Sequence, residues 1–177
     1  NSLALRFLSA FTEGGLEKAC LAGGCFWGVE YWISRLTGVV CCRSGFMGGN
    51  GVFPSYEEVC SQRTGFFEVV DLLFDPSQLL YKDLLRYFFE IHDSEQKNGQ
   101  GPDIGPQYGS AIFCFSPAQK KIAEEVQKEL LTIGISSHTT IRPASLFYPA
   151  DEKHQQYYNK TGHLPYCHTH KPLPWNS

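Results

Sequence analysis

The chain has 177 residues, of which 42% are hydrophobic, 14% aromatic and 19% charged, which suits one globular domain with a substantial core and excludes a disordered or fibrous protein. The formal net charge is −3 and the Lys and Arg residues form no cluster, so neither nucleic acid nor an anionic membrane is an expected partner. No apolar run approaches the ~20 residues of a membrane-spanning helix.

The N-terminal part of the chain predicts an arm, a strand and a helix. Residues 3–11 are largely apolar with one arginine, which fits either a targeting remnant or an arm packed on the domain. Residues 18–22 suit a short strand, and Gly23 and Gly24 allow a tight turn after it. Apolar residues at helical spacing then predict a helix with the inner positions Phe26, Val29, Ile33 and Leu36.

Further strands and helices follow in alternation. Strands are expected at residues 39–42 together with Phe46, and at 66–75, 109–115 and 139–144. Helices are expected after a capping box at Ser55, at 80–91, from Ser116 past Leu130, and at 151–158. The segment 93–108 is rich in Gly and Pro and has no periodicity, which is typical of a functional loop.

The connections between these elements are uneven in length, and the alternation is only partial. This pattern predicts an α+β fold, a mixed sheet with helices packed on it and a long C-terminal coil. The sequence contains no internal repeat, low-complexity tract or linker. We therefore expect a single domain over residues 1–177, with an N-terminal arm at 1–17 and a C-terminal tail at 159–177.

The seven cysteines are odd in number, and two of them, Cys41 and Cys42, are adjacent. A secreted disulfide framework normally shows an even, spaced set, so the cytoplasm or another reducing compartment, an organelle included, is the expected location. C-x-x-C is absent, which argues against a thioredoxin-type motif and against a paired-cysteine zinc site.

Cys25 is the first candidate for chemistry, because it falls at the predicted start of a helix. Unpaired N–H groups and the helix dipole favour an anion there, which predicts a lowered thiol pKa and a nucleophilic thiolate. Position alone leaves a buried structural cysteine equally plausible. Phe26 and Trp27 either pack in the core or form the wall of an apolar pocket for a methyl or thioether group.

Other candidates also have more than one interpretation each. Glu58 either caps its helix or acts as an acid, and Asp103 and Tyr108 are either turn and packing residues or site residues. Cys167 lies in the tail beside several histidines, of which His163 is one. It is an inert exposed thiol, part of a small zinc cluster, or a mobile thiol that condenses with a sulfenic acid on Cys25.

Four motifs together carry a resemblance to a known family. GCFWG at residues 24–28, EEVC at 57–60, EIHD at 90–93 and QGPDIGPQY at 100–108 resemble the peptide methionine sulfoxide reductase A family, from about residue 18 to about residue 158. The resemblance implies reduction of the S epimer of methionine sulfoxide, free or in proteins, on a two-layer, ferredoxin-like α/β plait. It also implies no bound cofactor or metal and a thioredoxin-like external reductant.

The resemblance assigns roles to individual residues near the first motif. Cys25 looks like the nucleophile that attacks the sulfoxide sulfur, and Phe26 and Trp27 look like the walls of the methyl pocket. Glu58 looks like the acid that protonates the sulfoxide oxygen.

The long loop and the tail receive the remaining roles. Asp103 and Tyr108 match residues that hold the substrate and polarise its oxygen. Cys167 looks like the resolving thiol, which forms a disulfide with Cys25 that a thioredoxin-like donor reduces.

Three positions depart from the family pattern. Phe46 stands where a tyrosine is usual in the substrate site, so a hydroxyl is missing, at a cost of about 1.5–3 kcal/mol if nothing replaces it. Gly65-Phe66-Phe67-Glu68 replaces Gly-His-Ala-Glu, and Gln107-Tyr108-Gly109-Ser110 replaces Gln-Tyr-Arg-Ser. We therefore expect weakened catalysis and an altered substrate preference, with the reaction itself retained.

The leading hypothesis is a monomeric thiol-dependent reductase of methionine S-sulfoxide. Two alternatives come from other classes, namely a methionine-sulfoxide-binding or redox-sensing module that has lost catalytic power, and a small zinc protein built on the tail. The sequence leaves open whether Cys20 or Cys60 relays the disulfide between Cys25 and Cys167.

Overall fold

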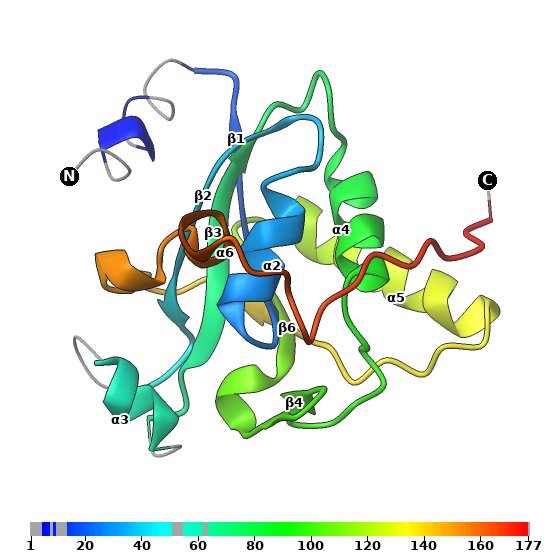
Figure 1. The fold of residues 1–177 in the computed structure, drawn as a ribbon. Coiled ribbons are helices and arrows are strands. Elements are labelled where there is room, and N and C mark those ends of the chain that lie inside the picture. The colour runs from blue at the N-terminus through cyan, green and yellow to red at the C-terminus, as the bar shows by residue number, and fades with distance from the viewer. Residues whose placement is uncertain (1–4, 8, 10–13, 51–54, 62–63, 177) are drawn as a thin grey trace.

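The structure, a computed structural model, describes residues 5–7, 9, 14–50, 55–61 and 64–176. Its framework is a six-stranded sheet in the order β7-β6-β1-β3-β2-β8, with helices packed against it (Figure 1). Neighbouring strands are antiparallel except β6 and β7, which are parallel. The prediction of an α+β fold with a mixed sheet is therefore confirmed.

The sheet contains β1 (Glu17–Gly23), β2 (Val39–Met47), β3 (Phe67–Phe74), β6 (Ser110–Cys114), β7 (Thr140–Pro143) and β8 (Tyr148–Pro149). A separate two-stranded ribbon consists of β4 (Gly99–Gln100) and β5 (Asp103–Ile104). The helices are α2 (Phe26–Ile33), α3 (Tyr56–Cys60), α4 (Tyr81–Glu90), α5 (Pro117–Thr132) and α6 (Tyr157–Thr161), with single 3-10 turns η1 (Pro106–Tyr108) and η2 (Glu152–His154). Most of the expected strands and helices lie within two residues of these bounds.

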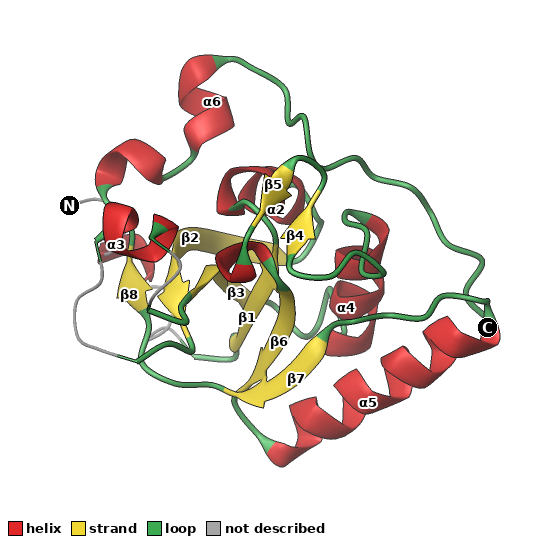
Figure 2. Cartoon of the chain, turned by 90° about the horizontal axis from the view of Figure 1, so that it is seen from below, coloured by secondary structure: helices red, strands yellow, loops and turns green. Residues whose placement is uncertain are grey.

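The connectivity of the central strands places the start of α2 in the middle of the sheet. The run β1-α2-β2-β3-α4-β6 puts its four strands in the order β6-β1-β3-β2, the arrangement of the split β-α-β unit of ferredoxin-like folds. β1 is therefore an internal strand, paired with β3 on one side and β6 on the other. Its carboxyl end leads directly into α2 (Figure 2).

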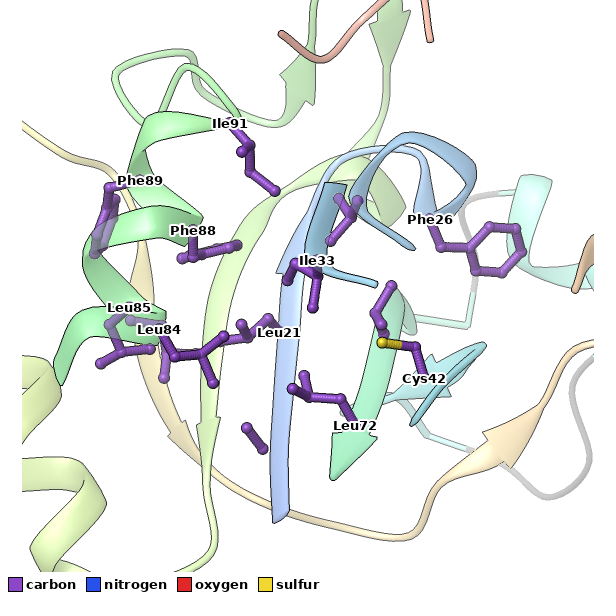
Figure 3. Close-up of a cluster of buried hydrophobic side chains, with 14 of the residues drawn as sticks. Leu21, Phe26, Ile33, Cys42, Leu72, Leu84, Leu85, Phe88, Phe89 and Ile91 are labelled. Atoms are coloured by element: carbon purple, nitrogen blue, oxygen red, sulfur yellow. The ribbon is translucent and has the colours of Figure 1, made fainter. Parts of the chain in front are cut away.

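The larger hydrophobic core lies between the sheet and the helices α2, α4 and α5. In Figure 3, Leu21 of β1, Ile33 of α2 and Leu84 of α4 lie in this cluster. Alternate residues of β1 turn to the other face, where Cys20 joins a smaller cluster. Cys20 has no solvent exposure, as the period of two in a buried strand requires.

The helix predicted at residues 151–158 is wrong, because tertiary hydrogen bonds interrupt it. Gln155 has an extended backbone, and its side chain accepts from Ser44 N and donates to Ser44 O, both at 2.8 Å. Gln156 then adopts a left-handed conformation, with φ of 51°. The segment is therefore split into η2 and α6.

The predicted N-terminal arm is partly described. Residues 5–7 and 9 are helical, and the rest of the apolar segment 3–11 lies outside the described residues. Phe7 is buried, and the Arg43 guanidinium lies 3.9 Å from the centroid of its ring, so this part of the arm packs on β2. Among the described helices, none is long and apolar enough to cross a membrane.

Truncation of a core leucine should destabilise the fold strongly. Leu84 is fully buried in α4, so Leu84→Ala leaves a cavity, and we expect the free energy of unfolding to fall by about 2–5 kcal/mol. The matched control is Leu131→Ala in α5, where the side chain is 63% exposed and a change within about 0.5 kcal/mol is expected. Urea unfolding followed by circular dichroism measures both, and equal losses would contradict the assignment of the core.

Candidate active site

The turn at Gly23 and Gly24 places Cys25 at the start of α2. Gly24 has φ of 96°, and a Cβ there would lie 2.5 Å from Gln100 Cβ, so only glycine fits. Cys25 is the N-cap residue, and its carbonyl accepts hydrogen bonds from the N–H groups of Gly28 and Val29. The predicted position of Cys25 at a helix start is confirmed.

The predicted lowering of the Cys25 pKa is wrong. The side chain is buried, and burial raises the pKa of the thiol well above its ordinary value. The carboxylates of Glu68 and Asp103 raise the pKa further, whereas a hydrogen bond from the Trp27 N–H acts in the opposite direction. The helix start therefore favours the thiolate as expected, but burial outweighs it, and Cys25 rests as a thiol at neutral pH.

Glu58 does not reach this site, and the acid role assigned to it is wrong. It forms the predicted capping box, in which its Oε2 accepts from Ser55 N at 2.6 Å and its N–H donates to Ser55 Oγ at 3.1 Å. These hydrogen bonds lower the pKa of the Glu58 carboxyl, which is exposed. An ionised surface carboxylate has no proton to give at neutral pH.

Glu68 occupies the place expected of the acid. It lies on β3 with 1% of its surface exposed, and its Oε1 accepts from the N–H of Phe26, the residue after Cys25, at 3.1 Å. Burial raises the pKa of Glu68 to about 8, and Asp103 contributes to the rise. Glu68 is therefore mostly protonated at neutral pH, and its Oε2 has no hydrogen-bond partner among the described residues.

A sequence signal for Glu68 existed. It is an acidic residue within a strongly apolar, β-branched strand, and a buried charge in such a strand is a candidate functional group. The capping-box spacing of Glu58, in contrast, had a sufficient structural explanation from the start.

An aromatic cluster borders the start of α2. The Trp27 ring stacks on Tyr157 with ring centroids 3.8 Å apart, and its Nε1 donates to His154 Nδ1 at 3.2 Å. The His154 ring in turn stacks on Tyr56 at 4.4 Å. Because Trp27 and Tyr56 are both partly exposed, they can form an apolar wall for a small thioether.

Phe26 and Phe46 lie beneath this wall instead of in it. Phe26 has no exposed surface, and its ring lies 5.6 Å from that of Phe46 and 6.4 Å from that of Tyr56. Phe46 is equally buried, at 1% exposure. Both rings therefore pack in the core beside the start of α2, and their role in the substrate site stays a prediction.

The hydroxyl groups near Glu68 come from Tyr56 and Tyr108. Tyr56 begins α3 and Tyr108 ends η1, and in each case burial followed by the Glu68 carboxylate raises the pKa of the phenol. Both are therefore neutral hydrogen-bond donors at physiological pH. Tyr56, a residue not predicted from the sequence, thus brings a hydroxyl near Glu68, and the weakened catalysis expected from Phe46 stays a prediction.

Asp103 joins the tail to the site. Its Oδ2 accepts hydrogen bonds from Tyr166 Oη at 3.1 Å and from Cys167 Sγ at 3.2 Å. Burial and this carboxylate raise the pKa of Cys167 to about 12. Cys25 and Cys167 are both free thiols. A negative charge on Cys167 raises the pKa of Cys25, and charges on both sulfur atoms raise the pKa of Tyr158, so the two thiols share the same surroundings.

The tail packs on the body of the domain through several hydrogen bonds, and the mobility expected of its thiol stays a prediction. Glu90, at the end of α4, accepts hydrogen bonds from His170 Nε2 and Trp175 Nε1, each at 2.8 Å, and from Leu173 N at 3.1 Å. Figure 1 shows this segment passing over α2 and α4. Within the described part of the chain, no three His, Cys, Asp or Glu residues gather as a metal-binding group.

Cys20 and Cys60, the two candidates for relaying the disulfide, lie in different places relative to the site. Cys20 is enclosed in the core on the far side of β1. Cys60, on α3, is partly exposed, and its thiol hydrogen-bonds with Tyr56. Burial, and with it the Glu68 carboxylate, raises the pKa of this thiol. Of the two relay candidates, only Cys60 therefore borders the site.

Comparison with known proteins gives a consistent result. The family model described as "Peptide methionine sulfoxide reductase" matches residues 17–174. Among curated relatives, peptide methionine sulfoxide reductase MsrA of Thermus thermophilus is 46% identical over 85% of this chain and 86% of its own length. The enzyme of the same name from Sulfolobus acidocaldarius is 46% identical over 86% of this chain and 87% of its own length.

Solved structures agree with the sequence relatives. Reduced Mxr1 from Saccharomyces cerevisiae superposes with a TM-score of 0.82 at 34% identity, covering 89% of this chain and 92% of that one. Methionine sulfoxide reductase A of Corynebacterium diphtheriae gives a TM-score of 0.76 at 32% identity, covering 92% and 84%. With the family model spanning nearly the whole domain, the chain belongs to the peptide methionine sulfoxide reductase family.

Proposed function

We propose that the protein reduces methionine S-sulfoxide, free or in oxidised proteins, through the thiol of Cys25. One observation carries this proposal, namely that a buried and protonated Glu68 hydrogen-bonds the N–H of the residue that follows Cys25. A nucleophile that starts as a thiol needs a group that exchanges protons at neutral pH, and a sulfoxide oxygen needs an acid. Glu68 meets both requirements, and membership of the reductase family supports the substrate.

The first step transfers oxygen from the substrate to the enzyme. Cys25 Sγ attacks the sulfoxide sulfur and forms a bond to it, Glu68 gives its proton to the sulfoxide oxygen, and the proton of the Cys25 thiol replaces it on Glu68. The S–O bond of the substrate then breaks and the hydroxyl passes to Cys25 Sγ, while the new S–S bond breaks and leaves its electron pair on the substrate sulfur. The substrate sulfur gains two electrons and leaves as methionine, while Cys25 is oxidised to a sulfenic acid. The hydroxyls of Tyr56 and Tyr108 donate hydrogen bonds to the oxygen, and Trp27 packs on the methyl group.

The second step resolves the sulfenic acid. Cys167 Sγ attacks Cys25 Sγ, the S–O bond breaks, and the hydroxyl leaves as water with the proton of the Cys167 thiol. Asp103 holds that thiol through the 3.2 Å hydrogen bond to its Oδ2. A thioredoxin-like dithiol protein then reduces the disulfide, and Mxr1 of Saccharomyces cerevisiae has been solved in complex with Trx2. We propose that the enzyme works as a monomer in a reducing compartment without a bound cofactor.

Removal of the two thiols should separate the steps. With Cys25→Ser, no methionine forms at all, because the nucleophile is gone. With Cys167→Ser, one methionine forms per enzyme, and turnover then stalls with thioredoxin as the reductant. Rapid-quench measurement of methionine per enzyme tests this, with Cys41→Ser, a half-buried cysteine of β2, as the control. Methionine formation by Cys25→Ser would refute the proposed role.

Loss of the acid should lower the rate and change its pH profile. We expect Glu68→Gln to lower the rate of methionine formation about 10²–10⁴-fold. In the wild type the rate should fall as the pH rises through about 8, where Glu68 loses its proton, and this alkaline limb should disappear in the variant. The matched control, Glu58→Gln, should stay within about twofold of the wild type. A similar loss in both variants would contradict the assignment.

The Glu68 carboxyl should also make the free energy of unfolding depend on pH. Its pKa in the folded state, about 8, lies above the ordinary value of 4.5, so the folded state binds this proton more tightly than the unfolded chain. The stabilisation is complete below about pH 4.5 and is lost as the pH rises through 8. Between pH 5 and 9 the unfolding free energy of the wild type should fall roughly 1–4 kcal/mol more than that of Glu68→Gln, measured by urea titration.

Repeated turnover distinguishes this enzyme from a sulfoxide-binding or redox-sensing module. With excess dithiothreitol and a sulfoxide substrate, we expect many methionines per enzyme, because the acid, the hydroxyls and the nucleophile are all in place. A pure binding protein would form none.

A further inference from the structure

His168, the residue after Cys167, is the most deeply buried residue of the tail. Only 1% of its surface is exposed, whereas nearby Leu164 and Tyr166 are 75% and 60% exposed. Its Nε2 lies 2.7 Å from the carbonyl oxygen of Gly23. Burial lowers the pKa of the ring, so His168 is neutral, and because a carbonyl only accepts, Nε2 carries the proton and donates it.

The His168 ring lies against the first turn of α2, where only a glycine leaves room for it. A Cβ at Gly28 would lie 2.1 Å from His168 Nδ1 and 2.7 Å from its Cγ. The backbone carbonyl of His168 is also held, since it accepts from Trp32 Nε1 at 3.0 Å. Ring and backbone are thus both attached to the segment that carries Cys25.

Cys167 therefore lies between two attachments to the body of the domain. On one side its Sγ donates to Asp103 Oδ2, and on the other the next residue is bound to Gly23, Gly28 and Trp32. Gly23 and Gly28 bracket Cys25 in the sequence. The position of Cys167 relative to Cys25 is thereby restricted by contacts that do not involve Cys25 Sγ.

We infer that His168 is the positioning residue of the disulfide step, holding Cys167 next to the turn from which Cys25 projects. The inference rests on the proposed function. In the step that it serves, the Cys167 S–H and the Cys25 S–OH become one S–S bond and one water molecule, with no other reactant. Holding two groups in attack geometry turns such a reaction into a fast intramolecular one. Oxygen transfer from the substrate does not involve Cys167 and needs no help from His168.

The two steps can be timed separately in the full-length enzyme, mixed with excess methionine sulfoxide and no reductant. Methionine formed in the burst reports oxygen transfer, and loss of free thiols reports the Cys25–Cys167 disulfide. We expect His168→Ala to give the wild-type burst of one methionine per enzyme at an unchanged rate. Its disulfide should form at least tenfold more slowly, and dimedone should trap the sulfenic acid on Cys25.

Four further variants keep the test specific. His168→Gln retains a side-chain N–H that reaches toward the Gly23 carbonyl, so it should recover much of the disulfide rate. Gly28→Ala expels the ring from the other side and should slow disulfide formation in the same way. The double variant His168→Ala/Gly28→Ala should be no slower than either single one, because both remove one contact. His163→Ala, an exposed tail histidine, is the matched control and should behave as the wild type.

The outcomes are separable. A disulfide rate in His168→Ala within twofold of the wild type overturns the inference, and so does an equal slowing of both steps, which would indicate a general structural role. Absence of a methionine burst in the wild type itself would refute the proposed function instead.

Discussion

The hydrogen bond from the Phe26 N–H to the buried Glu68 carboxyl is the constraint on which the site depends. It joins the first turn of α2 to β3, and thus fixes the nucleophile relative to a proton donor through backbone geometry. The same burial that makes Glu68 protonated keeps Cys25 as a thiol. Cys25 is therefore held in the less reactive thiol form, next to a carboxyl that can exchange a proton.

The position of β1 in the sheet and the contacts of α2 support this arrangement. Because β1 is internal and antiparallel to both β3 and β6, the turn after it opens beside the first residues of those strands, and the loops that precede them can reach Cys25. A second buried carboxyl, that of Glu30, also holds α2 in place, since its oxygens accept hydrogen bonds from Ser44 Oγ and from the Gln156 N–H. This ties α2 to β2 and to the start of the C-terminal segment, so the long tail begins from a defined place.

Sequence patterns predicted the α+β class, most strands and helices and the position of Cys25, because hydrophobic periodicity and glycine turns are local properties. These patterns failed where a residue far away in the sequence determines the local structure or the pKa. The thiol pKa depends on burial by the whole core, and the helix at 151–158 is broken by Gln155, which bonds to Ser44 over 100 residues away. The acid was predicted at Glu58 for the same reason, because it is the pairing of β3 in the sheet that brings Glu68 to α2.

The anchoring of the tail at Glu90 has a consequence for how electrons enter the enzyme. His170 is bound there only three residues after Cys167, so while this contact holds, Cys167 stays close to the body of the domain. A dithiol donor that meets Cys167 in this state comes to the body of the domain, beside Asp103 of β5. The contacts of the tail thus define where such a donor meets the enzyme.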